Sequence, residues 1–337
     1  MKGHQASHFS TLLHMMTGMV VSKHCHLPKV AGKVKSDIKQ ESQIKKFKRW
    51  LSNKSINGNV FYLPFLERLL PTLIKDNIKL IIDGSVIGKD SAALMASIVY
   101  KNRAIPIIWL MAEGRKGHFC KEYHIELLEM LKSILPNDIE IVIIGDGEFD
   151  NVEFLETIEE YGWYFVIRTA KNSKFSRRGD TIKLPKRLKS GECKSWSDLQ
   201  FTNVLYGPLQ LSIWKPDEKS ETIYLISNYH SPLKVRQCYK KRQQIETFFS
   251  DLKTKGFYIH KSHISDLRRL GNLMLAACLG YIWVVLLGEY ALNKGLNRIF
   301  HRTDRCDLSF FQLGFRYIEY LLTHNLTLPK INFRAME

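Results

Sequence analysis

The chain has 337 residues, enough for one large domain or for two to three modest ones. Apolar residues make up 45% and aromatic residues 11%, which favours a packed globular protein over a disordered basic tail. Lysine and arginine number 50 against 33 aspartates and glutamates, and the net charge of +17 indicates a polyanionic partner, either nucleic acid or an anionic membrane surface.

The first segment, residues 1–75, is basic and is expected to be helical. Apolar residues at positions 44, 47, 50 and 51 follow the pattern of an amphipathic helix whose opposite face is cationic. The charged face of such a helix is either solvated or in contact with DNA phosphates. We expect this segment to contact DNA.

Two apolar runs, expected to be buried strands, each lead into an aspartate. Residues 80–82 precede Asp83, and residues 139–144 lead through Gly145 to Asp146. An aspartate is costly to bury without a partner, so its place at the end of each run calls for compensation, most simply by a divalent cation. The alternative for either motif alone is a solvated Asp-Gly turn.

Further strands and helices are expected around these runs. Residues 92–101 and 104–111 complete a three-strand meander with the first run, and residues 121–135 have the apolar spacing of a helix. A second helix is expected over residues 151–162, because Asn151 precedes an acidic first turn. Residues 163–169 form the next expected strand.

Residues 171–220 have a different composition, with short strand-like runs separated by glycine and proline and a dense basic stretch at 171–194. Trp196 and Trp214 lie in this region, where each either stacks on an unpaired base or belongs to the core of a small β-rich unit. Residues 223–227 then form a final core strand.

The most informative segment is a helix containing Tyr239, Arg242, Glu246 and Lys253. On a helix that advances about 100° per residue, these four side chains share a stripe about 60° wide. A carboxylate flanked by cations is often a surface ion pair, which is the alternative reading. An apolar stripe runs beside it, formed by Cys238, Ile245, Phe248, Phe249 and Leu252.

Residues 272–288 carry no formal charge and are nearly long enough to cross a bilayer. Their length is at the bottom of the membrane-spanning range, and Asn272 and two glycines weaken that reading. We therefore expect a fully buried helix that seals the core, and no membrane partner.

Asp83, Asp146 and Glu246 together resemble the DDE triad of bacterial insertion-sequence transposases. The spacing Y-x2-R-x3-E-x6-K from Tyr239 to Lys253 matches the signature of the fourth insertion-sequence family letter for letter. The segments TGMVVSKHCHLPKVAG and GWYFVIR also resemble that family. The resemblance covers roughly residues 60–290.

This resemblance implies an α/β fold of the ribonuclease-H-like, retroviral-integrase-like kind: a mixed sheet flanked by helices, with the first two carboxylates on neighbouring strands and the third on a later helix. It also implies a β-rich insertion and helical N- and C-terminal segments. The expected domains are a basic helical segment (1–75), the catalytic core (76–170 and 221–260), the insertion (171–220) and a helical C-terminal region (261–337).

Three carboxylates suit two Mg²⁺ ions, with Mn²⁺ as an alternative, because hard cations take oxygen ligands and a pair of ions can assist phosphodiester cleavage. Asp83 would bridge the ions, and Asp146 and Glu246 would each complete one site. Arg242 and Lys253 are expected to neutralise phosphates, and Tyr239 to donate to a phosphate oxygen. Arg168 is a further candidate for this DNA surface.

The sequence therefore predicts a DNA transposase that binds the terminal inverted repeats of its element, cleaves the ends and transfers the 3′-hydroxyls into target DNA. We expect at least a dimer when two ends are paired, and a cytoplasmic, nucleoid-associated location in a bacterium. Two alternatives are open: a ribonuclease-H-fold nuclease without strand transfer, and a non-catalytic DNA-binding derivative.

Overall fold

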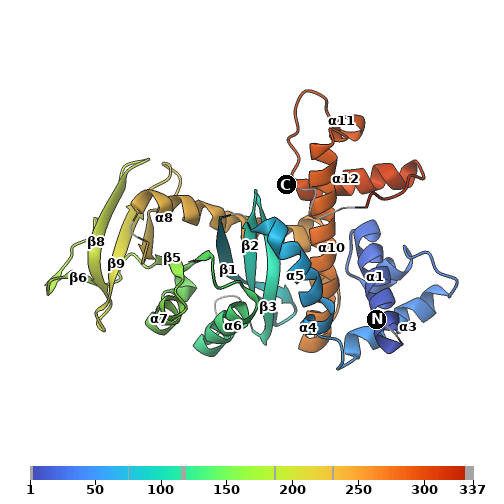
Figure 1. The fold of residues 1–337 in the computed structure, drawn as a ribbon, viewed down its shortest axis with the longest axis horizontal. Helices are drawn as coiled ribbons and strands as arrows, with labels where there is room; N and C mark the ends of the chain where they lie inside the picture. The colour runs from blue at the N-terminus through green and yellow to red at the C-terminus, as the bar shows by residue number, and fades with distance from the viewer. Residues whose placement is uncertain (1–2, 75, 115–118, 186, 230, 331–337) are drawn as a thin grey trace.

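The computed structural model describes residues 3–74, 76–114, 119–185, 187–229 and 231–330. The molecule is elongated: a β-rich region lies at one end, a sheet covered by helices lies in the middle, and a group of helices lies at the other end (Figure 1). The strands of the described residues form one ten-stranded sheet in the order β3-β2-β1-β4-β5-β10-β9-β8-β6-β7.

The first five strands of this order form the expected mixed core. β1 (Asn77–Gly88), β2 (Ser91–Tyr100) and β3 (Arg103–Glu113) form the antiparallel meander, as predicted. β4 (Glu140–Gly145) pairs in parallel with β1, and β5 (Tyr164–Thr169) pairs in parallel with β4. This is the ribonuclease-H-like arrangement, so the predicted fold class is confirmed.

The β-rich region continues the same sheet. β10 (Ile223–Ser227) pairs with β5 on one side and with β9 (Tyr206–Trp214) on the other. Beyond β9 lie β8 (Cys193–Phe201), β6 (Phe175–Arg177) and β7 (Asp180–Thr181). The insertion is therefore attached to the core through continuous backbone hydrogen bonding. Trp196 and Trp214 are half-buried in it.

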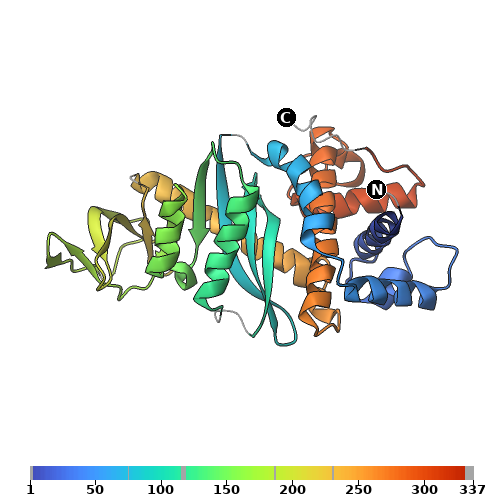
Figure 2. The ribbon, with the colours of Figure 1, turned by 60° about the horizontal axis from the view of Figure 1, so that its bottom comes forward.

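Helices cover the two faces of the core sheet. α6 (Lys121–Ile134) and α7 (Val152–Glu160) lie on one face (Figure 2). A helical rod lies on the other face, where it contacts β1 and β3. The rod consists of α8 (Pro232–Tyr239), η2 (Lys240–Arg242), α9 (Gln243–Ser250) and η3 (Asp251–Lys255).

The remaining helices pack at the end of the sheet nearest β3. The N-terminal ones are α1 (His4–Ser22), α2 (Leu27–Ala31), α3 (Gln40–Ser52), α4 (Gly58–Phe61) and α5 (Leu63–Leu73). The C-terminal ones are α10 (Leu267–Asn293), α11 (Asn297–Phe300) and α12 (Phe310–Thr323). The predicted amphipathic helix lies within α3, where Phe47, Trp50 and Leu51 are buried.

α10 is the centre of this helical group, with α1, α3, α12 and β3 packed around it. Within the part of the chain that the structure describes, it is the one helix long and apolar enough to cross a membrane, and 89% of its most apolar window is buried inside the protein. This burial is what a core helix shows, in line with the expected buried helix at residues 272–288.

The prediction that the first strand ends at Asp83 is wrong. β1 continues to Gly88, because Asp83, Gly84 and Ser85 remain paired with Met95, Leu94 and Ala93 of β2. The strand that ends beside Asp83 is β4, the parallel neighbour of β1, whose last residue is Gly145. Asp83 therefore lies just beyond the last residue of β1 that pairs with β4, inside a strand that continues to Gly88.

Candidate active site

The site lies where β1 extends past the end of β4. Ile81 of β1 pairs with Ile144 of β4, so the parallel register brings Asp83 level with Asp146 on the neighbouring strand. Asp83 is fully buried. Asp146 directly follows β4, and its Oδ1 accepts a hydrogen bond from the backbone N–H of Glu148 at 3.0 Å, which fixes the turn η1 (Gly147–Phe149).

The third carboxylate comes from the helical rod. Glu246 lies in the first turn of α9, and its side chain is about half exposed (49%). Arg242 joins it to the sheet: Nη2 of Arg242 lies 2.6 Å from Oε1 of Glu246, and Nη1 lies 3.4 Å from Oδ2 of Asp83. One guanidinium therefore bridges carboxylates from the sheet and from the rod.

All three acids raise the pKa of the Arg242 guanidinium. Burial alone would lower the pKa of its guanidinium, but Tyr239 and the carboxylates of Asp83, Glu246 and Asp146 outweigh burial and raise the pKa above its ordinary value. The three predicted catalytic carboxylates thus all interact electrostatically with the Arg242 guanidinium, although they come from three separate segments of the chain. The structure thus brings these three segments to one guanidinium, and the catalytic role of the three acids stays a prediction.

Tyr239 lies behind this cluster. Its side chain is buried at 7% exposure, and burial raises the pKa of the phenol, an effect that the nearby Arg242 and Arg168 oppose. Because it is packed against the site, Tyr239 supports Arg242 from the protein side. Its predicted contact with a DNA phosphate stays a prediction.

The prediction of one uniform helix from Tyr239 to Lys253 is wrong. Residues Lys240–Arg242 form a 3₁₀ turn and Asp251–Lys255 a π turn, so the angle between successive side chains departs from 100° at both places. The consequence is favourable for the site, because Nζ of Lys253 reaches Oγ of Ser85 at 2.7 Å, on the same face of β1 as Asp83. The neighbouring apolar stripe is buried, as predicted.

A cavity of about 720 Å³ opens beside Asp146 and Arg242. Asp146 and Arg242 lie on one side of it, and Arg168, Lys171 and Glu221 lie on the side nearest the insertion. The Arg168 side chain is 37% exposed, and its Nη2 lies 3.1 Å from Oε2 of the exposed Glu221. The predicted contact of Arg168 with DNA stays a prediction. The cavity has cationic side chains in its lining, Arg168, Lys171 and Arg242, which are suitable donors to a phosphodiester backbone.

Some residues of the site were not found from sequence. Glu148 lines the cavity with Asp146, and its Oε1 lies 3.6 Å from Nε2 of the buried His124. The position of Glu148 two residues after Asp146 was a usable signal, as was the two-residue spacing between Asp83 and Ser85 along one strand face. Glu221 carried no comparable signal, because its approach to Arg168 depends on β5–β10 pairing.

Comparison with known proteins identifies this architecture. Residues 76–283, well over half of the chain, match the family described as the transposase DDE domain. The chain belongs to this transposase family. It is therefore a DNA transposase of the DDE class, a metal-dependent polynucleotidyl transferase and endonuclease.

The fold of this DDE transposase is also seen in a solved structure. A piggyBac transposase synaptic complex with hairpin DNA, determined by cryo-electron microscopy, matches it with a TM-score of 0.51 at 13% sequence identity. The match covers 99% of this chain and 75% of the other. No curated protein matches the chain. At this level of identity the structural likeness concerns the fold.

DDE transposases use divalent metal ions, and the acids of this chain can be tested against that need. Three carboxylates supply the oxygen donors that hard divalent ions prefer. Over the described ranges, no three acid, histidine or cysteine side chains lie close enough to hold an ion together. The donor chemistry of the three acids suits a divalent ion, but in this structure they are not drawn close enough to hold one, and Arg242 lies between Asp83 and Glu246.

Proposed function

We propose that this transposase belongs to a bacterial insertion sequence of the fourth family, binds the terminal inverted repeats of its element, cleaves the ends and joins the freed 3′-hydroxyls to target DNA. The observation that carries the proposal is the contact of Arg242 with both Asp83 and Glu246, with Asp146 acting on the same guanidinium. The family signature thereby has a physical meaning, because its arginine, glutamate and lysine all face the catalytic strand.

Asp83, Asp146 and Glu246 would hold the divalent ions, which we propose to be two Mg²⁺, with Mn²⁺ able to replace them. When bound, such ions activate water and stabilise the leaving 3′-oxygen. Asp83 would contribute to this set from β1, which lies next to β4, the strand that Asp146 follows, and near Arg242 of the rod. Arg242 would then be free to bind the phosphates of the substrate.

The walls of the 720 Å³ cavity would hold the DNA strand that is cut. Arg168 and Arg242 present guanidinium groups to it, and Lys253 extends the cationic surface along β1. These contacts reach the phosphate backbone, so sequence preference for the element ends must come from elsewhere, for which the basic helices of residues 1–75 are candidates. Pairing of two ends implies at least a dimer.

The protein is proposed to work on nucleoid DNA in the bacterial cytoplasm. All six cysteines are free, as expected in a reducing compartment. The net charge of +17 favours association with nucleic acid.

The decisive experiment incubates the purified protein with labelled element ends and Mg²⁺ and measures both nicks and joined products. Asp83→Asn, Asp146→Asn and Glu246→Gln should each abolish cleavage and leave DNA binding nearly intact, because binding depends on cations. Asp138→Asn is the matched control: this exposed acid precedes β4 at the opposite edge of the sheet, so its loss should leave cleavage unchanged. Substantial Mg²⁺-dependent cleavage by any of the three site variants would refute the triad.

A second assay separates transposition from plain nuclease activity. Pre-cleaved ends with a free 3′-hydroxyl should be joined to a target plasmid. Degradation of DNA without preference for element ends, and without joined products, would favour the ribonuclease-H-fold nuclease.

A further inference from the structure

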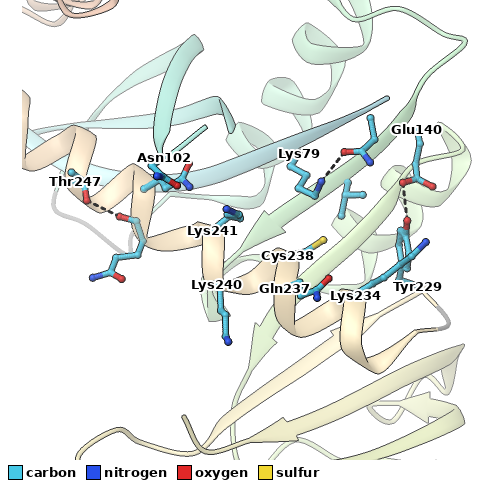
Figure 3. Close-up of a pocket in the computed structure, with 14 residues that line it drawn as sticks. Lys79, Asn102, Glu140, Tyr229, Lys234, Gln237, Cys238, Lys240, Lys241 and Thr247 are labelled. Atoms are coloured by element: carbon cyan, nitrogen blue, oxygen red, sulfur yellow. Dashed lines mark hydrogen bonds between the residues drawn. The ribbon is translucent and has the colours of Figure 1, made fainter. Parts of the chain in front are cut away.

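A second concave site lies between the rod and the sheet (Figure 3). Its volume is about 740 Å³, and it is bounded by the first residues of β1 and β4, by the β2–β3 turn and by the rod. We call it the lysine groove after four lysines that line it: Lys79, Lys234, Lys240 and Lys241.

The lysine groove has a strong excess of positive charge. Its one acid, Glu140, accepts a hydrogen bond from the hydroxyl of Tyr229 at 2.7 Å, and Lys79 donates to the neutral amide of Asn77 at 2.7 Å. Within the described residues, none of the four lysines forms an ion pair with a carboxylate. The other polar groups of the wall are mainly amides, which can donate to anionic oxygens: Asn77, Asn102, Gln237, Gln243 and Gln244.

The 3₁₀ turn of the rod divides its cations between the two sites. Three successive basic residues at about 120° per residue cannot share one face. Arg242 points to the carboxylates, whereas Lys241 extends toward β1 and Lys240 extends away from it, with its ammonium 5.1 Å from the Trp214 ring (Figure 3). These three successive side chains of the rod therefore supply cations both to the catalytic site and to the groove.

The lysine groove is separate from the catalytic cavity. The two share no lining residue, and Lys79 precedes Asp83 by four residues on the same strand face, which corresponds to about 13 Å. The catalytic cavity has its own cations in Arg168, Lys171 and Arg242. A DNA strand bound at the carboxylates for cleavage would therefore not place its phosphates in the groove, and the groove lysines would remain without negative charges to neutralise them.

We propose that the lysine groove binds the sugar–phosphate backbone of a second DNA duplex, independently of its sequence, while the carboxylates act on the duplex that is cut. Lysine ammonium groups and side-chain amides are typical donors to phosphate oxygens. This inference rests on the proposed function, since a strand-transfer reaction must bring two DNA molecules to one protein. The groove would raise the local concentration of the second duplex.

The test measures capture of a labelled random-sequence duplex by full-length protein already bound to an unlabelled element end, without metal and at several salt concentrations. The variant Lys79→Gln/Lys234→Gln/Lys241→Gln should weaken capture at least about tenfold and reduce the log–log salt slope by up to about 2.7, roughly 0.9 for each phosphate contact. Binding and Mg²⁺-dependent cleavage of the end should stay within about twofold of wild type.

The matched control is Lys294→Gln/Arg298→Gln/Arg305→Gln, which removes the same charge from exposed positions near α11 and should leave capture unchanged. Equal loss of end binding and of capture in the groove variant would assign the groove to the cut duplex and overturn the proposal. Unchanged capture, or equal loss in the control, would overturn it too. Capture needs no cleavage, so a wild-type protein that neither cuts nor joins would refute the proposed function and leave this test valid.

Discussion

The guanidinium of Arg242 lies 2.6 Å from the carboxylate of Glu246, and the same group reaches Asp83 at 3.4 Å. This contact neutralises acids that would otherwise repel one another in the metal-free protein. The same contact would compete with a bound metal ion for the oxygens of Asp83 and Glu246. A DNA phosphate is an alternative acceptor for Arg242, so substrate binding and metal loading are expected to assist each other.

The first prediction concerns this competition. Arg242→Gln should bind Mn²⁺ at least about tenfold more tightly than wild type in the absence of DNA, because a nearby cation no longer opposes the ion. Cleavage of element ends should fall, since a phosphate contact is lost. Electron paramagnetic resonance of Mn²⁺ measures the affinity directly. Lys240→Gln removes a charge from the same turn, away from the acids, and should bind Mn²⁺ as wild type does. Equal affinities for all three proteins would show that Arg242 does not compete with metal.

The second prediction concerns Lys253, whose ammonium lies 2.7 Å from Oγ of Ser85. Lys253→Ala should weaken end complexes about tenfold and lower the log–log salt slope by about 0.9. Ser85→Ala should produce a smaller loss with an unchanged slope, because the charge stays while one contact that orients it is removed. Lys240→Ala should affect end complexes much less than Lys253→Ala. Equal losses at positions 240 and 253, measured by titration at several salt concentrations, would indicate a diffuse basic surface.

Local patterns predicted the core strands well. The strand at 223–227 was placed at its observed bounds, and the helix at 121–135 within one residue, because apolar periodicity and breakers are local signals. The sequence did not predict that β1 continues past Asp83. This continuation depends on pairing with β2, and the residues near Asp83 contain no local signal for that pairing. A carboxylate inside a strand is also unfavourable by propensity.

The site was predictable where spacing along one element determined it. Arg242, Glu246 and Lys253 were placed together from their spacing alone, and the structure brings them to β1. The 3₁₀ and π turns were not predictable, because residues 240–255 contain no glycine or proline that would mark them. Their positions coincide with contacts between the rod and the sheet, which only the folded chain supplies.

The third prediction concerns the π turn and pH. Asp251 is the first residue of this turn, and its side chain is buried. Its Oδ2 lies 2.8 Å from Nη1 of Arg103. Burial raises the pKa of the Asp251 carboxyl to about 6, although the positive charge of Arg103 acts in the opposite direction. A raised pKa means that the folded state favours the protonated acid. Its contribution to stability is therefore complete below the unfolded pKa near 4 and is lost as pH rises through 6, by about 3 kcal/mol for roughly two pKa units.

Asp251→Asn has no titratable group at this position, so comparison with it isolates the pH dependence of stability that comes from the Asp251 carboxyl. The free energy of unfolding of wild type relative to Asp251→Asn should fall between pH 4 and pH 7, as measured by urea denaturation at each pH. Asp138→Asn, at an exposed acid, should show no such trend. A difference that is constant or rises over this range would mean that Arg103 keeps Asp251 ionised in the folded protein.

The fourth prediction concerns the crossing of α10 and α12, which holds the helical group together. A Cβ added at Gly288 would lie 2.8 Å from the backbone nitrogen of Gly314 and closer still to the carbonyl oxygen of Phe310. Both are backbone atoms, so the helices would have to separate. Gly288→Ala should lower the free energy of unfolding by about 3 kcal/mol or more, beyond the gain in helix propensity.

Gly280→Ala is the matched control on the same helix. Its Cβ would meet Val20, Met16 and Phe257 at 3.4 to 3.5 Å, which is ordinary van der Waals contact. The gain in helix propensity of up to about 1 kcal/mol should therefore appear as unchanged or slightly increased stability. Urea denaturation of the two variants measures the contrast. Because α10 also packs on β3, Gly288→Ala should lower cleavage at temperatures where Gly280→Ala is fully active. Equal stability of the two variants would show that α10 and α12 do not cross at backbone contact in solution.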